Sequence, residues 1–358
     1  MFFIDQNIAY SCCRSHPVDL TEFKDLTSVV QHWTFENQQL ELGVKVGSCK
    51  SCWQDEENNL PSYRMQFGQL PQEHSISLGL SNACNQMCSY CSSKHSSTWQ
   101  NSIETLGNFS NVSGTTQKNL MPLAKVKIDP DEWMQQIRQH ISTYPDRSIN
   151  LSITGGEPLM QKTALQKLLS LVDTKIKHIT VHSNLNPPDN KFLIWLLENY
   201  PDNRLRFAIS IDAVPDFNHL PRAGFDKTKF NQNFKILLDN QIPFTFFTVS
   251  SVLNFFDMPN FVKWLHVNQF NVRYTKINNP DCLDPVWIPR PFADVVLSQI
   301  EHVPQVLQNL TPNASLIDIK LKEQYNYLTQ YFERTGTDIN TTNAGFNQYW
   351  AWLEERFG

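Results

Sequence analysis

Three cysteines in one short segment carry the clearest chemical signal in this sequence. Cys84, Cys88 and Cys91 stand in the spacing CxxxCxxC, just past an apolar segment that predicts a strand. Thiolates are soft ligands that favour iron–sulfur clusters or zinc. Three thiolates on one loop bind three irons of a cubane and leave the fourth iron open for an exchangeable ligand. The alternative is a structural zinc site, which needs a fourth ligand such as His95.

A second candidate site follows the next predicted strand. Gly155, Gly156 and Glu157 come directly after Ser148–Thr154, and Pro158 follows them. Two glycines let a ligand approach the backbone closely, and a carboxylate beside them can hold an ammonium group. Alone, the segment also fits a plain strand-to-helix turn. Its place one strand after the three cysteines favours a ligand site.

Six short apolar segments separated by amphipathic segments predict the scaffold that must position these residues. Strands joined by short helical connections pair in parallel with right-handed crossovers. The expected fold class is therefore α/β, either a partial (β/α)6 barrel or an open sheet. The predicted strands are Ser75–Leu80, Ser148–Thr154, His178–His182, Arg206–Ile211, Phe244–Val249 and Val272–Ile277. The predicted helices are Asp131–Ile141, Gln161–Leu171, Lys191–Glu198, Lys227–Leu238 and Met258–His266, and then Phe292–Leu307, Leu316–Arg334 and Asn343–Arg356.

The chain is expected to have three parts. Residues 1–72 predict a small cysteine-rich module with a few short elements, residues 73–290 the barrel, and residues 291–358 a helical extension that covers its open side. Ser92–Leu123, rich in Ser, Asn and Thr, predicts a long insertion without secondary structure. Such an insertion is either a lid that contacts substrate or a mobile, solvated loop.

Composition narrows the classes of function. No uncharged apolar run approaches the length of a membrane span, and the first residues lack the pattern of a signal peptide, so we expect a cytoplasmic protein without a membrane partner. Thiols stay reduced in the cytoplasm, so eight cysteines there indicate metal or cluster ligation. The formal net charge of -5 provides no global basic field that would attract nucleic acid.

On the cysteine and Gly-Gly-Glu-Pro motifs, the chain resembles the radical SAM superfamily, roughly over residues 75–290. The resemblance implies a [4Fe–4S] cluster on the three cysteines and S-adenosylmethionine (SAM) at the carboxyl ends of the strands. It implies that Tyr90 packs near the adenine and that Glu157 meets the SAM amino group. It also implies SAM contacts from Ser183 and Asn184, where family members often carry Thr-Asn-Gly.

Other strand ends extend the resemblance, with one departure. Leu185 stands where the family's motif has its glycine, which calls the backbone geometry there into question. Ser210 and Asp212 resemble the family's Ser-x-Asp, whose serine bonds the ribose or the SAM carboxylate. Arg222 resembles the arginine that pairs with that carboxylate. The alternatives are that Asp212 caps the following turn and that Arg222 lies on the surface.

Four early cysteines suit a second metal centre. Cys12, Cys13, Cys49 and Cys52 provide four thiolates for an auxiliary cluster or for zinc. Cys-x-x-Cys-Trp resembles the auxiliary-cluster region of Twitch and SPASM radical SAM proteins, although a further Cys-x-x-Pro-Trp segment is missing. Either both adjacent cysteines ligate, or one iron is open. Cys282 follows the sixth strand as an isolated thiol, a further ligand, a hydrogen donor or a buried core residue.

The resemblance implies an enzyme that cleaves SAM reductively to a 5′-deoxyadenosyl radical, which abstracts hydrogen from a substrate. It also implies an electron donor such as flavodoxin or ferredoxin. We expect a peptide or protein substrate, with oxidation of a small molecule such as a sugar or nucleotide as the alternative. A nucleic-acid-modifying enzyme of the same family and a zinc-stabilised, non-enzymatic interaction protein are the competing classes.

Overall fold

The computed structural model of the chain describes residues 26–57, 74–79, 81–114, 149–170, 176–200, 204–277, 279–308, 314–339 and 342–358, with three short N-terminal strands and isolated residues between these ranges. They belong to two compact units. Unit 1 comprises Met1–Ser81, Ala124–Val181 and Tyr200–Arg206; unit 2 comprises Asn82–Leu123, His182–Asn199 and Phe207–Gly358.

All six predicted strands form, each within two residues of its predicted bounds. Hydrogen bonding orders them β11-β10-β8-β7-β6-β4, and the ladders β4–β6, β6–β7, β8–β10 and β10–β11 are parallel. The predicted α/β fold with a six-stranded parallel sheet, as in a partial (β/α)6 barrel, is confirmed, and the described strands do not close into a full barrel. The strands are β4 (His74–Gly79), β6 (Ile149–Thr154), β7 (Ile176–Ser183), β8 (Leu205–Ser210), β10 (Phe244–Ser250) and β11 (Val272–Lys276).

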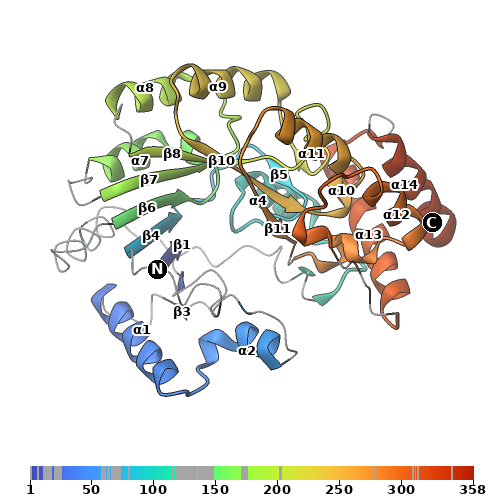
Figure 1. Ribbon diagram of the computed structural model, residues 1–358, viewed down its shortest axis with the longest axis horizontal. Coiled ribbons are helices and arrows are strands. Elements are labelled where there is room, and N and C mark those ends of the chain that lie inside the picture. Colours follow the sequence, from blue (N-terminus) through green and yellow to red (C-terminus); the bar gives the residue numbers. More distant parts are fainter. Residues whose placement is uncertain are drawn as a thin grey trace. The chain divides into compact units, whose positions relative to one another are not determined.

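Unit 1 contains β4, β6 and the N-terminal strand β1, which Figure 1 shows side by side. Along β6, buried and half-buried residues alternate, so Ile149, Leu151 and Ile153 all point into the core. The helix α7 (Lys162–Leu169) buries Leu165, Leu168 and Leu169 on one stripe, as an amphipathic helix beside a sheet does. The helix α7 corresponds to the predicted helix Gln161–Leu171.

The N-terminal residues contribute more structure than the sequence indicates. β1 pairs in parallel with β4, and β2 and β3 follow in antiparallel order, so the sheet continues beyond its six parallel strands. The helix α1 has 16 residues, longer than the short elements predicted here. The bounds are β1 (Phe2–Asp5), β2 (Ile8–Tyr10), β3 (Val18–Asp19), α1 (Leu26–Glu41), η2 (Gly47–Cys49) and α2 (Lys50–Glu57).

Unit 2 is organised around aromatic packing between α9 (Lys227–Asp239) and β10. The helix begins at Asp226, whose side chain accepts a hydrogen bond from the Lys229 N–H at 3.0 Å. Phe234 on the helix meets Phe244 on the strand edge to face, with ring centroids 5.1 Å apart. The predicted helices 191–198 and 258–266 form as α8 (Lys191–Asn199) and α11 (Met258–Val267), and α10 (Val252–Phe255) precedes α11.

Three C-terminal helices lie close together within unit 2 (Figure 1). α13 (Ile317–Thr335) and α14 (Ala344–Phe357) match their predicted bounds to within one residue. The prediction of one helix from Phe292 to Leu307 is wrong, because α12 (Arg290–Leu297) ends ten residues earlier. Only a short helix, η6 (Gln305–Leu307), follows Pro304, whose ring blocks a continuous helix through this segment.

The prediction that Ser92–Leu123 lacks secondary structure is also wrong. The segment contains α4 (Ser97–Leu106), and Trp99 on this helix is completely buried. Farther along, Phe109 stacks on Tyr327 of α13 with ring centroids 4.8 Å apart. The described part of the segment is therefore docked on its own unit. The predicted helix Asp131–Ile141 lies outside the described residues.

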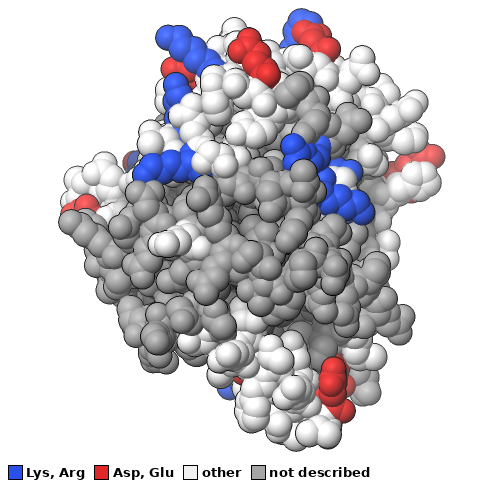
Figure 2. All heavy atoms as spheres, turned by 90° about the vertical axis from the view of Figure 1, so that its left-hand side faces the viewer, with Lys and Arg blue, Asp and Glu red and all other residues white. Residues whose placement is uncertain are grey.

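Figure 2 shows one face of the molecule, where described Lys and Arg side chains lie interspersed with described Asp and Glu side chains. Among the described helices, none combines the length and apolar character that a membrane span requires.

Candidate active site

The loop that carries Cys84, Cys88 and Cys91 belongs to unit 2 and is tightly folded. The Cys91 N–H donates to the Cys88 carbonyl at 2.9 Å. Cys88 lies in β5 (Met87–Cys88), which pairs antiparallel with β9 (Arg222–Ala223). Cys88 is buried and the other two cysteines are half-buried. We call residues 82–91 the cysteine loop.

Side chains from distant parts of unit 2 hold the backbone of the cysteine loop. The indole of Trp99 donates to the Cys88 carbonyl at 2.9 Å. Two tyrosines of α13 do the same: Tyr327 donates to the Ser89 carbonyl at 2.6 Å, and Tyr331 to the Met87 carbonyl at 3.1 Å. Because a buried carbonyl without a partner is costly, these bonds stabilise this one loop conformation. No pattern in the sequence indicates that α13 reaches the loop.

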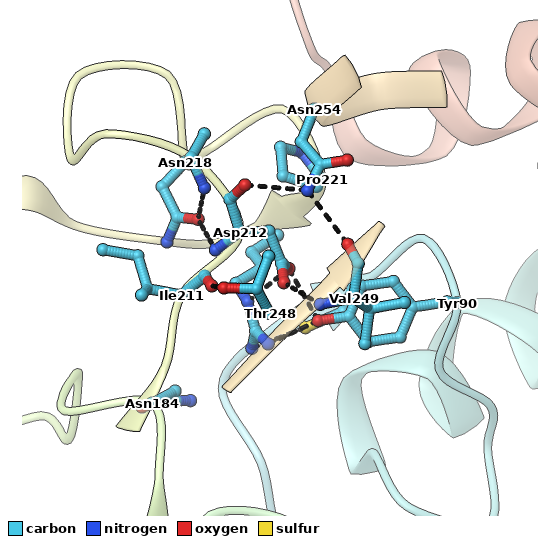
Figure 3. A network of polar contacts seen from close by, with 12 residues as sticks. Tyr90, Asn184, Ile211, Asp212, Asn218, Pro221, Thr248, Val249 and Asn254 are labelled. Atoms are coloured by element: carbon cyan, nitrogen blue, oxygen red, sulfur yellow. Dashed lines mark hydrogen bonds and ion pairs between the residues drawn. The ribbon is translucent and has the colours of Figure 1, made fainter. Parts of the chain in front are cut away.

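A buried polar network joins the cysteine loop to the end of β8. Tyr90 Oη donates to Asp212 Oδ2 at 2.6 Å, and Arg222 Nε donates to the same oxygen at 2.7 Å. Arg222 also donates to Tyr90 Oη, and its Nη1 lies 3.5 Å from Cys88 Sγ. Figure 3 shows Tyr90 and Asp212 turned toward one another within this network. Tyr90, Asp212 and Arg222, which the family resemblance singles out at three separate places in the sequence, thus form one cluster against Cys88.

The main chain around Asp212 is equally constrained. Asp212 Oδ1 accepts the Val249 N–H at 2.8 Å, and the Asp212 N–H donates to Asn218 Oδ1 at 2.8 Å. Asn254 donates to the Asp212 carbonyl at 2.7 Å (Figure 3). The Asp212 carboxylate is therefore the counter-ion of Arg222. The turn after β8 is held by the side chain of Asn218, not by a cap from Asp212, which was the alternative. The sequence analysis missed both Asn218 and Asn254. The one signal that could have indicated Asn254 is its place in a capping box that begins at Ser251.

The ionisation of these groups reflects their burial. Burial raises the pKa of the Cys88 thiol, and Arg222 acts to lower it. Burial also raises the pKa of Cys91, and the neighbouring Cys88 and Cys84 add to the increase. Burial acts to lower the pKa of Arg222, but Asp212, Tyr90 and Cys88 beside it together outweigh this effect and raise the pKa, so the guanidinium stays charged. A metal that binds these thiols therefore has to displace protons, as thiolate ligation generally requires.

The end of β7 is attached to the cysteine loop through asparagines. Asn184 Nδ2 donates to Asn85 Oδ1 at 3.2 Å, and Asn85 Nδ2 donates to the Asn186 carbonyl at 2.5 Å. Leu185 has a φ of 52°, in the left-handed region that glycine adopts without strain. The backbone conformation expected of a glycine is therefore present although the residue is leucine. Ser183 Oγ accepts the Leu185 N–H at 2.9 Å.

The Gly-Gly-Glu-Pro segment belongs to unit 1. Gly155 has a φ of 106°, which side chains rarely allow, and the Gly156 N–H donates to the Ser81 carbonyl at 2.7 Å. Glu157 is 1% exposed, and its Oε1 accepts the Leu159 N–H at 3.0 Å at the start of η3 (Pro158–Met160). The buried carboxylate of Glu157 thus follows a turn whose backbone conformation requires glycine at position 155. Ser210, half-buried, ends β8.

Of the cysteines outside the cysteine loop, the structure describes Cys49, Cys52 and Cys282. Cys49 and Cys52 lie three residues apart; Cys49 is half-buried, and Cys52 is 3% exposed. Cys12 and Cys13 lie outside the described residues. Cys282 is completely buried, and Gln324 of α13 donates to its carbonyl at 2.5 Å. Cys282 is therefore a core residue of unit 2 and does not open to solvent.

The donors of the cysteine loop fit an iron–sulfur cluster. The three thiols belong to one loop and are close enough to influence one another's pKa. In the described part of the chain, no three or more His, Cys, Asp or Glu side chains surround a position for one metal ion. A cubane does not require such a convergence, because each of its cysteines binds a different iron.

The comparisons with solved structures find distant similarities. No curated protein matches the sequence. Among solved structures, the chain is similar to native anSMEcpe with bound AdoMet, with a TM-score of 0.42, 16% identity and coverage of 75% of this chain and 62% of that one. It is also similar to SuiB of Streptococcus suis bound to the precursor peptide SuiA, with a TM-score of 0.40, 12% identity and coverage of 95% and 72%. The chain spans about three fifths of the length of the anSMEcpe chains.

The family comparison covers the region described above. The model described as Radical SAM superfamily matches residues 78–265, which is 188 of the 358 residues and more than half of the chain. The match includes the cysteine loop, the Gly-Gly-Glu-Pro segment and the network around Asp212. The chain therefore belongs to the radical SAM superfamily of enzymes, which bind SAM and a [4Fe–4S] cluster.

Proposed function

We propose that Cys84, Cys88 and Cys91 hold the [4Fe–4S] cluster and that Tyr90, Asp212 and Arg222 form one wall of the SAM site beside it. The observation that carries this proposal is the position of Arg222. Its guanidinium contacts Cys88 Sγ at 3.5 Å and Asp212 at 2.7 Å, so the sulfur ligand and the polar network are in direct contact.

In this arrangement, Arg222 supplies a permanent positive charge next to a sulfur that becomes a thiolate on ligation. Asp212 balances that charge, and Tyr90 bridges the two groups through its hydroxyl. Because Asp212 and Arg222 are buried and Tyr90 is half-buried, their charges act through a medium that screens them less than water does. The network therefore keeps this wall of the site ordered before SAM arrives.

The other SAM contacts are proposed on the family resemblance and on local geometry. Glu157 provides a buried carboxylate suited to the SAM amino group, beside the close backbone approach that Gly155 and Gly156 permit. Ser183, Asn184 and Ser210 are the proposed polar contacts at the ends of β7 and β8. Since Asn184 also bonds Asn85 of the cysteine loop, it would position that loop as well as SAM.

When bound, the cluster supplies the electron that cleaves the sulfur–carbon bond of SAM and yields the 5′-deoxyadenosyl radical. The residues of this chain bind and orient SAM and exclude water from it. Burial of Cys88, Asp212 and Arg222 supports the last of these roles.

We also propose an auxiliary metal centre in residues 1–72, ahead of a barrel in residues 73–290 and a helical extension in 291–358. Cys49 at the end of η2 and Cys52 in the first turn of α2 would provide two ligands, and Cys12 and Cys13 the others. A flavodoxin or ferredoxin is the proposed electron donor. Zinc is the alternative metal at this centre.

A peptide or protein is the substrate class that we propose, on the resemblance to Twitch and SPASM enzymes. A free loop at 92–123 could reach over a peptide substrate. The described part of this insertion is instead packed on α13, so it does not support the peptide proposal. The direct test is to incubate the loaded enzyme and SAM with a short peptide encoded beside its gene and to measure the peptide mass. Turnover of a sugar or nucleotide, with no change in the peptide, would contradict the proposal.

The test of the core function is anaerobic reconstitution followed by SAM and dithionite. We expect 5′-deoxyadenosine, with about four irons per chain for one cluster and about eight if the auxiliary centre is also a cluster. Cys88→Ala should abolish the product, whereas Cys282→Ala, which alters a cysteine outside the loop, should retain it. Bound zinc, or product formation by Cys88→Ala, would contradict the assignment.

A further inference from the structure

Gln86 is a buried side chain of the cysteine loop for which the proposed SAM site has no role. It lies between Cys84 and Cys88 and is 1% exposed. Ser96 Oγ donates to its backbone carbonyl at 2.7 Å, so its main chain is held in place. Its side-chain nitrogen Nε2 has no hydrogen-bond partner among the residues that the structure describes. A buried donor without a partner is destabilising, so a buried amide in this position needs an explanation.

The other end of the amide points to that explanation. Gln86 Oε1 lies 3.7 Å from Cys88 Sγ, with the thiol as donor. A cysteine that ligates iron is a thiolate, which has no proton to donate and only accepts hydrogen bonds. An amide oxygen facing that sulfur would then be repelled. Half a turn of the amide about its last side-chain bond exchanges Oε1 for Nε2 at almost the same position.

We infer that Gln86 donates a hydrogen bond from Nε2 to Cys88 Sγ when Cys88 ligates the cluster. This inference rests on the proposed role of Cys88. Arg222 Nη1 lies 3.5 Å from the same sulfur, so Cys88 would receive a charged and a neutral donor. Hydrogen bonds to ligand sulfurs favour the more negative, reduced cluster and raise its reduction potential. Gln86 is thus a positioning residue that tunes the cluster.

Substitution by methionine tests this role, because methionine has a similar length and no amide. The matched control is Gln324→Met, which removes a completely buried glutamine of α13 whose side chain bonds the Cys282 carbonyl and the Tyr349 hydroxyl. The measurement is an EPR-monitored redox titration of the cluster signal that changes on addition of SAM. We expect a more negative midpoint potential for Gln86→Met at the iron content of the wild type, and no shift for Gln324→Met. Equal potentials for Gln86→Met and the wild type would overturn the inference.

A second measurement needs no substitution and decides the matter if Gln86→Met fails to fold or to take up iron. The wild-type protein is labelled with ¹⁵N at the side-chain amides of glutamine, and the reduced cluster is studied by pulsed EPR. A ¹⁵N coupling to the cluster would support the hydrogen bond, and its absence would overturn it. A wild-type chain that binds no iron would instead contradict the proposed function itself, so the two failures can be told apart.

Discussion

The carboxylate of Asp212 balances the charge of Arg222 and also orders the surrounding backbone. Both side chains of the pair are at least nine-tenths buried. Burying two charges costs more than burying apolar groups, so such a pair contributes little net stability by itself. Removing one partner is different, because it leaves the other charge buried and uncompensated.

We therefore expect Asp212→Asn to lower the free energy of unfolding by about 3–5 kcal/mol. Asp216→Asn is the matched control, since Asp216 pairs with Lys227 on the surface, where both side chains are at least half exposed. That variant should lose less than about 1 kcal/mol. Urea denaturation of both variants, without added iron, makes the comparison. A similar loss of unfolding free energy in the two variants would contradict the prediction, because the buried pair would then contribute no more than the exposed one.

Leu185 shows how a side chain and a backbone preference can oppose one another. Its φ of 52° favours glycine by about 1–2 kcal/mol, whereas its complete burial contributes more than that. Asn233 Nδ2 donates to its carbonyl at 2.9 Å and helps to hold the conformation. Burial exceeds strain, which explains how leucine replaces the glycine of the family motif without changing the backbone.

We expect Leu185→Ala to lose about 2–5 kcal/mol of stability. Leu185→Gly should lose no more than Leu185→Ala, because glycine relieves the strain. At Leu237, equally buried but within α9, the glycine variant should instead be about 1 kcal/mol less stable than the alanine variant. Thermal and urea unfolding of the four variants test this reversal, and the same order at both positions would refute it.

At the scale of elements, β9 and the cysteine loop are packed against one another without room for a side chain at Gly224. A Cβ there would lie 2.6 Å from the Asn85 carbonyl oxygen, and the φ of Gly224 is +88°. Asn85 stands between Cys84 and Cys88, so any movement that relieves the contact shifts the proposed ligands. The glycine thus couples the strand to the geometry of the loop.

Gly224→Ala should lose about 1–3 kcal/mol of stability and take up less iron on reconstitution. Gly336→Ala separates this effect from simple backbone strain, because Gly336 also has a positive φ, +63°, but nothing lies within 4 Å of its would-be Cβ. The control should lose about 1 kcal/mol and keep the iron content of the wild type. Iron counts and urea titrations for both variants suffice, and full loading of Gly224→Ala would contradict the prediction.

Elements were predictable where their pattern is local. The six strands are continuous or alternating apolar runs, so their positions follow from short windows of sequence. The helix α4 escaped prediction because only Trp99 and Ile103 mark its buried side within a Ser- and Asn-rich segment. The network could not be predicted as a network, since Tyr90 and Asp212 are 122 residues apart and only the fold brings them together.

At the scale of the whole molecule, Asp257 links stability to pH. It is 2% exposed, and its Oδ2 accepts the Val214 N–H at 3.2 Å. Burial raises its pKa to about 6, whereas the usual value is 3.8. Below the usual pKa the carboxyl is neutral in both the folded and the unfolded state. Between the two values only the folded state holds the proton, so stability falls as pH rises, and above about 6 the full cost of the buried charge, about 3 kcal/mol, is present.

The stability of Asp257→Asn relative to the wild type should therefore increase from pH 4 to pH 7 and then level off. Urea unfolding at several pH values gives this difference, and Asp294→Asn, at a position with a 63% exposed side chain, provides the baseline. A difference that does not vary with pH would contradict the assigned cost.

The hydroxyl of Tyr327 bonds the Ser89 carbonyl across 238 residues of sequence, and this separation has a consequence for biosynthesis. A ribosome adds about 5–20 residues per second, so the cysteine loop is complete about ten to fifty seconds before the tyrosine that secures it exists. During that interval water must occupy the place of the tyrosine hydroxyl. The cysteine loop therefore reaches the conformation described above only after α13 has been synthesised, and a ligand that requires this conformation can bind only after that point.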